Sequence, residues 1–109
     1  MAYDENLARR MRNQLIDVLG MVEKKMFGGI GFLIHGNMAC GVNGSDLIVR
    51  LSPEQYDAAI AKPYVKVFDM TGRPMRGWVV VTSKGYEAEQ DLRDWIQLGV
   101  TFARSLPAK

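Results

Sequence analysis

Residues 26–51 read MFGGIGFLIHGNMACGVNGSDLIVRL, and this stretch decides the fold. Its glycines disfavour a helix, because each glycine costs a helix interior about 1 kcal/mol relative to alanine. Apolar residues alternate in its first part, so we predict an extended segment over residues 26–34. The core candidates of this segment are Phe27, Ile30, Phe32 and Ile34.

Turn signals divide the rest of this stretch into strands. Gly36-Asn37 predicts a turn before a short strand over residues 38–42. Asn43-Gly44 predicts a type I′ hairpin, since both central positions of that turn need a positive φ. The returning strand then covers residues 46–51. We therefore predict a three-stranded antiparallel meander.

Amphipathic helices are predicted at both ends of the chain. After the N-cap candidate Asp4, apolar residues recur in steps of three and four up to Val22, with Gly20 as a C-cap candidate. Ser52-Pro53 predicts the start of a short helix that runs to about residue 61. A closing helix ends before Pro107. Its apolar stripe consists of Ala88, Leu92, Trp95, Ile96, Gly99, Phe102, Ala103 and Leu106.

Two more strands are predicted between the second and third helices, over residues 64–70 and 78–82, with a loop over residues 71–77. The strand over residues 78–82 lacks polar alternation, which places it inside the sheet. The order α-β-β-β-α-β-β-α predicts an α+β fold of two layers, a five-stranded antiparallel sheet covered on one face by helices. The length of 109 residues fits a single domain, residues 1–109.

The composition is that of an ordinary globular domain, with 48% apolar and 24% charged residues and a net charge of +2. These values exclude a disordered tail, a collagen-like fibre and a disulfide-stabilised miniprotein. Cys40 is the only cysteine, so no intrachain disulfide can form, which favours a reducing compartment. The N-terminus is acidic, and the longest apolar run is far shorter than the ~20 residues of a membrane span. We expect a cytoplasmic protein that does not bind membranes.

His35 and Cys40 are the only candidates for nucleophilic catalysis. His35 adjoins a predicted turn, and the sequence holds no second histidine to build a metal set. Cys40 lies mid-strand, where it alternates with Met38 and Val42, and free cysteines are usually buried. No orienting acid or oxyanion hole accompanies the pair. We expect no catalytic, cofactor or metal site, with a small-molecule binder or enzyme using Cys40 and His35 as an alternative.

The glycine run over residues 28–31 matches neither phosphate-loop pattern, because it opens a strand and lacks the required spacing. We interpret it as a bulge, or as backbone packed closely under a helix.

Basic residues form two groups that could bind phosphate. The first group comprises Arg9, Arg10, Arg12, Lys24 and Lys25, on the first helix and just after it. The second comprises Arg73 and Arg76, which flank Pro74-Met75 in the loop over residues 71–77. Acidic residues interleave with the first group, and no aromatic residue is placed for base stacking. A solvated surface is the simpler interpretation, and direct nucleic-acid binding is an alternative. Met75, in a loop, is a candidate for a partner contact.

The stretch over residues 24–32, KKMFGGIGF, resembles the N-terminal domain of the TfoX/Sxy family, bacterial proteins known from the regulation of natural competence. Met26, Phe27, Gly28 and Gly29 form the signature, and the resemblance covers roughly residues 5–105. It implies an α+β fold with an antiparallel sheet, no catalytic residues, and a co-regulatory role beside another DNA-binding factor.

The full-length regulators carry a second, C-terminal helical domain, and we expect this chain to stand alone without it. The resemblance therefore implies a non-enzymatic regulatory or protein-interaction domain. Its expected partner is another protein, either a transcription factor or a second copy of itself.

Overall fold

The computed structural model describes residues 3–26, 28–68 and 77–108, which form an α+β fold. Its elements in chain order are α1 (Glu5–Leu15), β1 (Met21–Met26), β2 (Gly29–Ile34), β3 (Asn37–Asn43), β4 (Asp46–Arg50), α2 (Pro53–Ala59), β5 (Val65–Val67), β6 (Trp78–Val81), the 3-10 turn η1 (Ser83–Gly85) and α3 (Glu89–Ser105). None of the helices in these ranges is long and apolar enough to cross a membrane.

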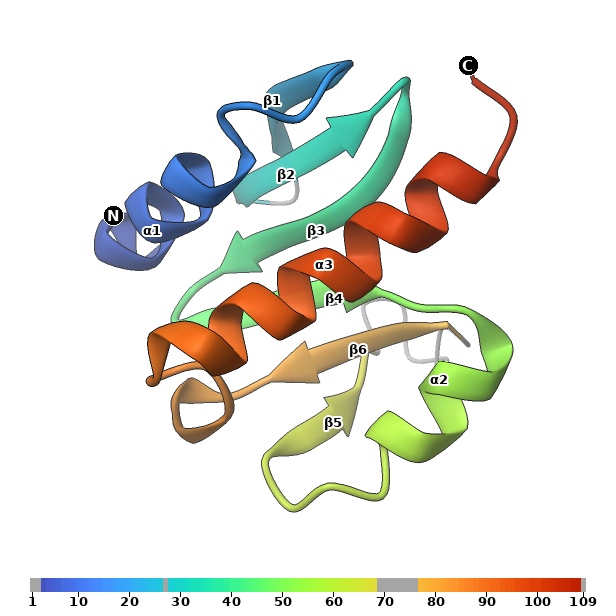
Figure 1. Cartoon of the computed structure of the whole chain (residues 1–109). Helices are drawn as coiled ribbons and strands as arrows, with labels where there is room; N and C mark the ends of the chain where they lie inside the picture. The colour runs from blue at the N-terminus through green and yellow to red at the C-terminus, as the bar shows by residue number, and fades with distance from the viewer. Residues whose placement is uncertain (1–2, 27, 69–76, 109) are drawn as a thin grey trace.

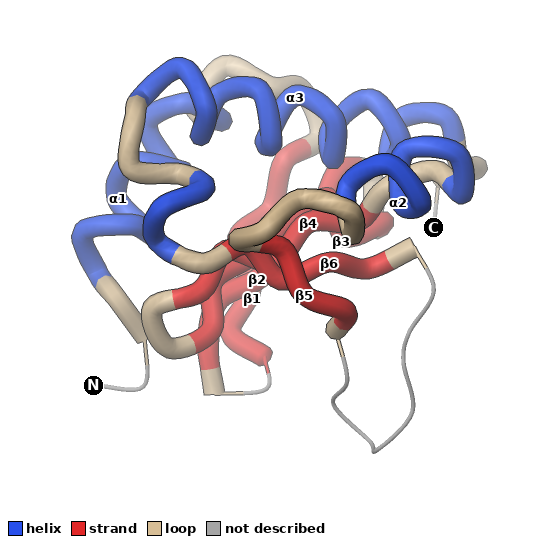
Figure 2. The backbone as a smooth tube through the Cα atoms, turned by 90° about the horizontal axis from the view of Figure 1, so that it is seen from below, coloured by secondary structure: helices blue, strands red, loops and turns tan. Residues whose placement is uncertain are grey.

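Within the described residues the sheet has six strands in the order β1-β2-β3-β4-β6-β5, and all neighbours are antiparallel (Figure 1). The three α-helices lie on one face of this sheet (Figure 2). The predicted two-layer α+β architecture is confirmed, and so is the interior position of β6, between β4 and β5. The predicted strand number is wrong by one, because the sheet has six strands rather than five.

The additional strand is β1, which follows the predicted first helix, and the last predicted helical residues, 16–20, form a connection instead. Asp4 caps α1 as expected, its carboxylate accepting from the backbone N–H of Asn6 and Leu7. The helix ends at Leu15, however, and Gly20 (φ +79) lies in the connection that leads into β1. Beyond Leu15 the apolar stripe is only partly covered, since Val18 packs against the core while Leu19 is 79% exposed. Helix stability in proteins comes mainly from such packing.

The signature stretch forms a hairpin turn rather than one continuous strand. Met26 pairs with Gly29 across the β1–β2 connection, so the predicted extended segment over residues 26–34 is broken in two. Gly28 has φ +77, a backbone conformation that glycine adopts without steric cost. The meander therefore has four strands, β1 to β4, instead of three. Phe27 lies outside the described residues.

The other two hairpins are each displaced by one residue from the prediction. The β2–β3 hairpin turns at His35 (φ +51) and Gly36 (φ +86), the pattern of a type I′ turn, and Asn37 already belongs to β3. The β3–β4 hairpin turns at Gly44-Ser45, with a positive φ at Gly44 alone (φ +58). A single positive φ at the first central position is the requirement of a type II′ turn, not of the predicted type I′.

The remaining elements follow the prediction closely. Ser52 caps α2, its Oγ accepting from Gln55 N at 3.4 Å. Strand β5 is shorter than the predicted residues 64–70, and β6 ends one residue before the predicted Thr82. Most of the predicted loop over residues 71–77 lies outside the described residues.

The core fills the space between the helices and the sheet. Ile30, Phe32 and Ile34 of β2 are buried as predicted. A bulge between β2 and β3 at Phe32/Leu33 changes the phase of β3, so Met38 pairs with Leu33 and does not share the core face of Cys40.

Helix α3 crosses the sheet at close range. A Cβ built at Gly99 would stand 2.4 Å from Ala39 O of β3, so the helix backbone rests directly on the strand. Trp95 is 6% exposed, and its Nε1 donates to Gly85 O at 3.0 Å. Trp95 is therefore buried, as its place on the predicted apolar stripe implies, and it anchors α3 to η1, which follows β6.

Candidate interaction surface

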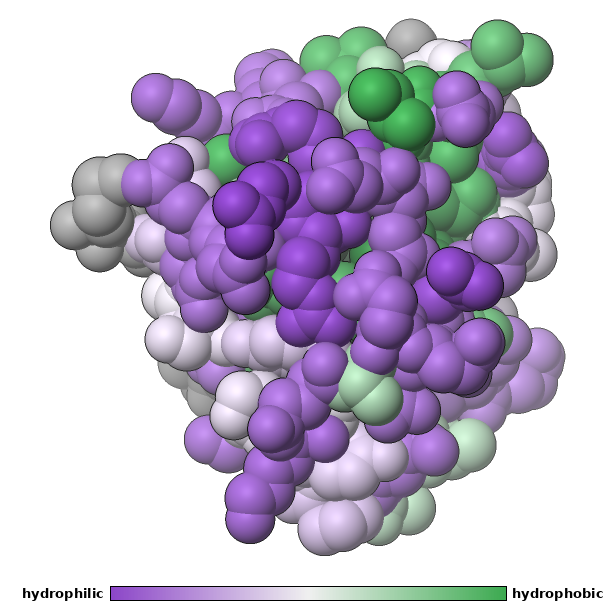
Figure 3. Space-filling model, turned by 60° about the vertical axis from the view of Figure 1, so that its left-hand side comes forward, coloured by the Kyte–Doolittle hydropathy of each residue, from purple (hydrophilic) through white to green (hydrophobic). Residues whose placement is uncertain are grey.

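The connection between α1 and β1, residues 16–20 (the connector), exposes apolar side chains. Ile16 is 71% exposed and Leu19 is 79% exposed, and Val22 follows on β1 at 56%. Elsewhere in the described ranges only Ile60 and Val67 are large, apolar and exposed, both below 40%. Figure 3 shows hydrophobic surface gathered toward the top of the view, beside a broad hydrophilic area. Apolar side chains that gather on a surface mark an interaction site more often than scattered ones do.

An open groove of about 460 Å³ lies beside the connector, between α1 and α3. Leu15, Ile96 and Val100 line it from the two helices, and Val18 lines it from the connector. Ile96 and Val100 are almost fully buried, so the groove reaches down to the core. The groove and the connector therefore form one continuous surface with apolar residues at its floor and rim.

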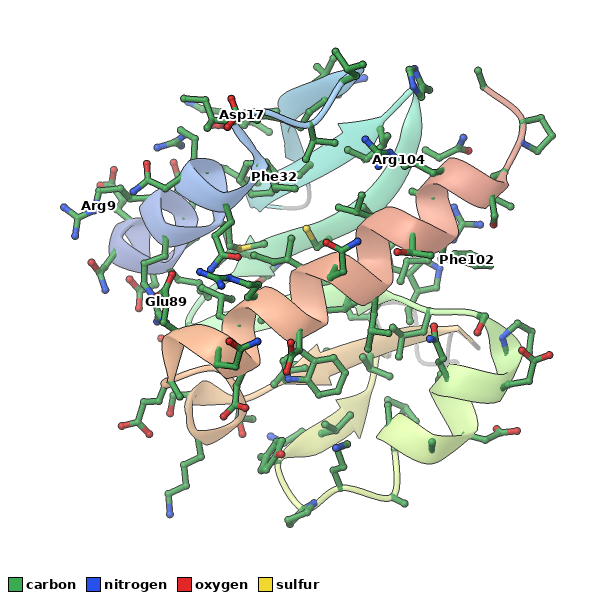
Figure 4. All side chains as sticks on the ribbon, viewed as in Figure 1. Arg9, Asp17, Phe32, Glu89, Phe102 and Arg104 are labelled. Carbon is green, nitrogen blue, oxygen red and sulfur yellow. The ribbon has the colours of Figure 1, made fainter. Side chains whose placement is uncertain are left out.

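Two arginines of α3 flank this groove. Arg93 and Arg104 both line it and are exposed, and neither forms an ion pair with any described residue. They are three turns of helix apart, about 16 Å along the axis. Arg104 lies near the C-terminal end of α3 (Figure 4). The surface thus offers two cationic groups above an apolar floor.

Arg10, one of the predicted phosphate-binding residues, is held by the start of α3. Its guanidinium donates to Glu89 Oε1 at 3.1 Å and to the carbonyl oxygens of Tyr86 and Glu87. Gln14 donates to the other oxygen of Glu89 at 2.8 Å. The hydrogen bond from Gln14, followed by those from Arg10, lowers the pKa of Glu89. Arg10 therefore ties α1 to α3 and is not free to bind a phosphate.

Arg12 is also bound to a carboxylate. Its Nε and Nη2 donate to the two oxygens of Glu23 at 2.6 and 2.9 Å, a bidentate pair that joins α1 to β1. This hydrogen bond lowers the pKa of Glu23 and raises that of Arg12. Arg9 donates to Asn6 Oδ1 at 2.5 Å, and its side chain points away from the body of the domain (Figure 4).

The predicted basic group is therefore divided rather than assembled. Lys24 and Lys25 lie in β1, not after a helix, and consecutive strand residues point to opposite faces. Of the first group, only Arg9, Lys24 and Lys25 lack a carboxylate partner among the described residues. The second group, Arg73 and Arg76, and the suspected contact residue Met75 lie outside the described residues.

His35 and Cys40 lie in different environments. His35 occupies the β2–β3 turn, with its ring against Gly20, and its backbone N donates to Gly20 O at 3.0 Å. Cys40 is completely buried in the core, and burial raises the pKa of its thiol to about 12. A nucleophilic cysteine needs a lowered pKa and access to solvent. Over the described ranges, no group of three or more His, Cys, Asp or Glu residues could hold a metal ion.

The glycines of the signature stretch have a structural reason. A Cβ at Gly29 would meet Val42 O of β3, and one at Gly41 would stand 2.6 Å from Ile30 O. The predicted close backbone approach is therefore present, although it is made to the neighbouring strand and not to a helix. Gly31 pairs with Gly41 across the same two strands.

These features define a small two-layer α+β domain with helices on one face of its sheet and an exposed apolar surface at one edge. The family model of the TfoX N-terminal domain matches residues 13–103, most of the chain. The chain therefore belongs to the TfoX N-terminal domain family, as the signature stretch predicted. Comparisons with curated proteins and with solved structures gave no match.

Proposed function

We propose that this TfoX N-terminal domain is a non-enzymatic protein-interaction domain that acts in transcription control in the cytoplasm. Its docking surface consists of the connector and the adjoining groove between α1 and α3. The observation that carries the proposal is the exposure of Ile16 and Leu19, at 71% and 79%. Full burial of such a side chain contributes about 1.5–3 kcal/mol, so both together favour association by about 3–6 kcal/mol.

The groove indicates the chemistry of the partner segment. Leu15, Ile96 and Val100 offer apolar contacts, while Arg93 and Arg104 offer two guanidinium groups at some distance from each other. A partner segment with apolar side chains flanked by Asp or Glu complements both features. An amphipathic helix can present such side chains along one face.

Nucleic acid is the less favoured partner. With Arg10 and Arg12 held by Glu89 and Glu23, three cations of the first basic group remain without a carboxylate partner among the described residues. Three phosphate contacts would give a log–log salt slope of about −3 at most. We expect a flatter response than this for duplex DNA, and a slope near −5 would favour direct nucleic-acid binding instead.

Enzymatic use of Cys40 is disfavoured by its burial and its raised pKa. The core position of the thiol, between Phe32 of β2 and Val49 of β4, gives it a packing role.

The proposal is tested by affinity purification of the tagged full chain expressed in its own host. We expect one or more proteins to be retained reproducibly by the wild type and lost with Leu19→Asp, because a charge on the connector opposes docking. Ile60→Asp, at an exposed apolar position at the end of α2, is the matched control and should retain the same proteins. Equal retention by Leu19→Asp and the wild type, or no reproducible protein at all, would refute the proposal.

A further inference from the structure

Strand β1 gives the sheet an edge that can be extended. The two outer strands are β1, with six residues, and β5, with three. Figure 1 shows β1 at the outer margin, beyond β2. Edge strands expose unpaired N–H and C=O groups, and very short ones such as β5 are poor templates for pairing. An additional strand would therefore add to β1.

The pairing of β1 with β2 determines which backbone groups point outward. Met26 and Gly29 flank a two-residue turn, so they form a hydrogen-bonded pair. At the other end, His35 N donates to Gly20 O at 3.0 Å. Because such pairs alternate along an antiparallel ladder, residues 20, 22, 24 and 26 bond to β2. The outward N–H and C=O groups of β1 are those of Met21, Glu23 and Lys25, and among them Met21 N already donates to Val18 O at 3.3 Å. An added strand would therefore bond mainly to Glu23 and Lys25.

The side chains of β1 carry a self-complementary charge pattern. Glu23 and Lys25 are two residues apart and share one face of the sheet, while Lys24 lies on the other face. Glu23 accepts from Arg12, whereas Lys25 is exposed and makes no ion pair within the described ranges. Next to them, Val22 is 56% exposed, a large apolar residue on a strand with little cover.

We propose that a second copy of this chain adds antiparallel to β1 about a two-fold axis at Lys24, which makes one continuous sheet across the dimer. A two-fold axis between antiparallel strands is perpendicular to the sheet, so one residue faces its own copy. When the axis passes through Lys24, Glu23 of each copy lies opposite Lys25 of the other copy. An axis at Glu23 would place two carboxylates opposite each other. An axis at Lys25 would place two ammonium groups opposite each other.

The same register accounts for two other features of the strand. It places Val22 of each copy against the strand of the other copy, which removes this exposed apolar side chain from water twice in the dimer. It also places the two Lys24 side chains opposite each other, and this unfavourable like-charge pair limits the affinity of the dimer. Lysines on an edge also discourage other registers, so the edge is selective rather than generally adhesive. This dimer uses β1 and not the connector, and it is therefore independent of the proposed docking function.

Sedimentation equilibrium of the full chain tests the proposal, with circular dichroism to verify that each variant folds. We expect a concentration-dependent dimer for the wild type. Lys25→Glu places two carboxylates opposite each other at two positions of the dimer and should weaken dimerisation about tenfold or more. Glu23→Lys should weaken it to the same extent, because it places two ammonium groups opposite each other at the same two positions. Lys84→Glu makes the same charge change as Lys25→Glu at an exposed position of η1, outside β1, and is the matched control, which should dimerise like the wild type. Lys24→Thr removes the central repulsion and should tighten the dimer.

Mixing the two charge variants gives the decisive result. A Lys25→Glu chain and a Glu23→Lys chain face each other with two pairs of opposite charge, so native mass spectrometry should show their heterodimer in preference to either homodimer. A monomeric wild type, or homodimers that persist in both charge variants, would overturn the proposal, as would the absence of the heterodimer. Leu19→Asp should leave the dimer intact, which separates this result from a failure of the docking function.

Discussion

Gly99 is the position where the packing of α3 on the sheet can be tested most sharply, because two physical effects of opposite sign meet there. Glycine in a helix interior is destabilising, so Gly99→Ala should gain up to about 1 kcal/mol from helix propensity alone. The added Cβ, however, would stand 2.4 Å from Ala39 O and 3.1 Å from Ala39 C. Both atoms belong to the backbone of a completely buried residue in β3, so neither can rotate away.

The clash determines whether Gly99→Ala raises or lowers the free energy of unfolding. Restoring an ordinary separation requires α3 to lift from β3 by about 1 Å, which loosens contacts along the helix, and such overpacking costs typically 1–3 kcal/mol or more. Because the Cβ meets fixed backbone here, we take the upper part of that range, and after the propensity gain a net destabilisation of about 1–2 kcal/mol remains. In a domain of this size, that lowers the Tm by roughly 4–12 °C.

Urea unfolding followed by tryptophan fluorescence measures this difference, since Trp95 lies one turn before Gly99 on the same helix. Thr101→Ala, at an exposed position of α3, is the matched control and should be neutral or slightly stabilising. If Gly99→Ala raised the free energy of unfolding by about 1 kcal/mol, as at an exposed helical glycine, the described contact between α3 and β3 would be wrong.

Three further predictions concern the core and the charged contacts. Trp95→Ala should cost roughly 3–5 kcal/mol and Trp95→Phe less, and a loss below about 1 kcal/mol in chemical denaturation would contradict the anchoring role of Trp95. Cys40, whose pKa is raised to about 12, should resist alkylation at pH 8 until the domain unfolds, and mass spectrometry of rapid labelling in the native state would disprove its burial. The pKa values of Glu23 and Glu89 are lowered in the folded state, so the folded state binds fewer protons than the unfolded state in acid. The stabilisation that these two carboxylates give the folded state is therefore complete above their ordinary pKa of 4.5. It is lost as the pH falls through their pKa values in the folded state. The difference in Tm between wild type and Glu89→Gln should accordingly vanish in acid, and a difference that stayed constant with pH would argue against the network of Arg10, Gln14 and Glu89.

The strands after β1 were predictable because their signals are local. Alternating apolar residues and turn residues lie next to one another in the sequence, so Ile30, Phe32 and Ile34 could be assigned to the core directly. The turns were displaced by one residue because the positive φ at His35 and the single positive φ at Gly44 depend on strand register, which composition does not specify.

The end of α1 could not be predicted from periodicity. Val18 and Val22 continue the apolar spacing of the helix, but spacing does not say whether anything lies against that face. In the fold the fully buried residues of α1 end at Leu15, the chain turns, and Ile16 and Leu19 of the connector become exposed. Gly20 is the only local signal of this change, and it was consistent with both interpretations.

The candidate surface escaped prediction for the same reason. Ile16 lies off the apolar stripe that the spacing of the first helix predicts, and Leu19 lies on it. The role of Arg10 depends on Glu89, which is distant in the sequence, and the role of Arg12 depends on Glu23, which lies on another element. Sequence alone showed acidic residues interleaved with the basic ones, and the structure shows which of them form ion pairs.

Site-specific photocrosslinking in the host cell tests the central claim, that the connector docks a partner protein. A photoreactive phenylalanine analogue in place of Leu19 should give one dominant adduct with a different protein, and that adduct should disappear when Ile16→Asp is added. The same analogue in place of Lys84, on η1, should not give this adduct. An identical adduct pattern from both positions, or no protein adduct from position 19, would contradict the docking function of the connector.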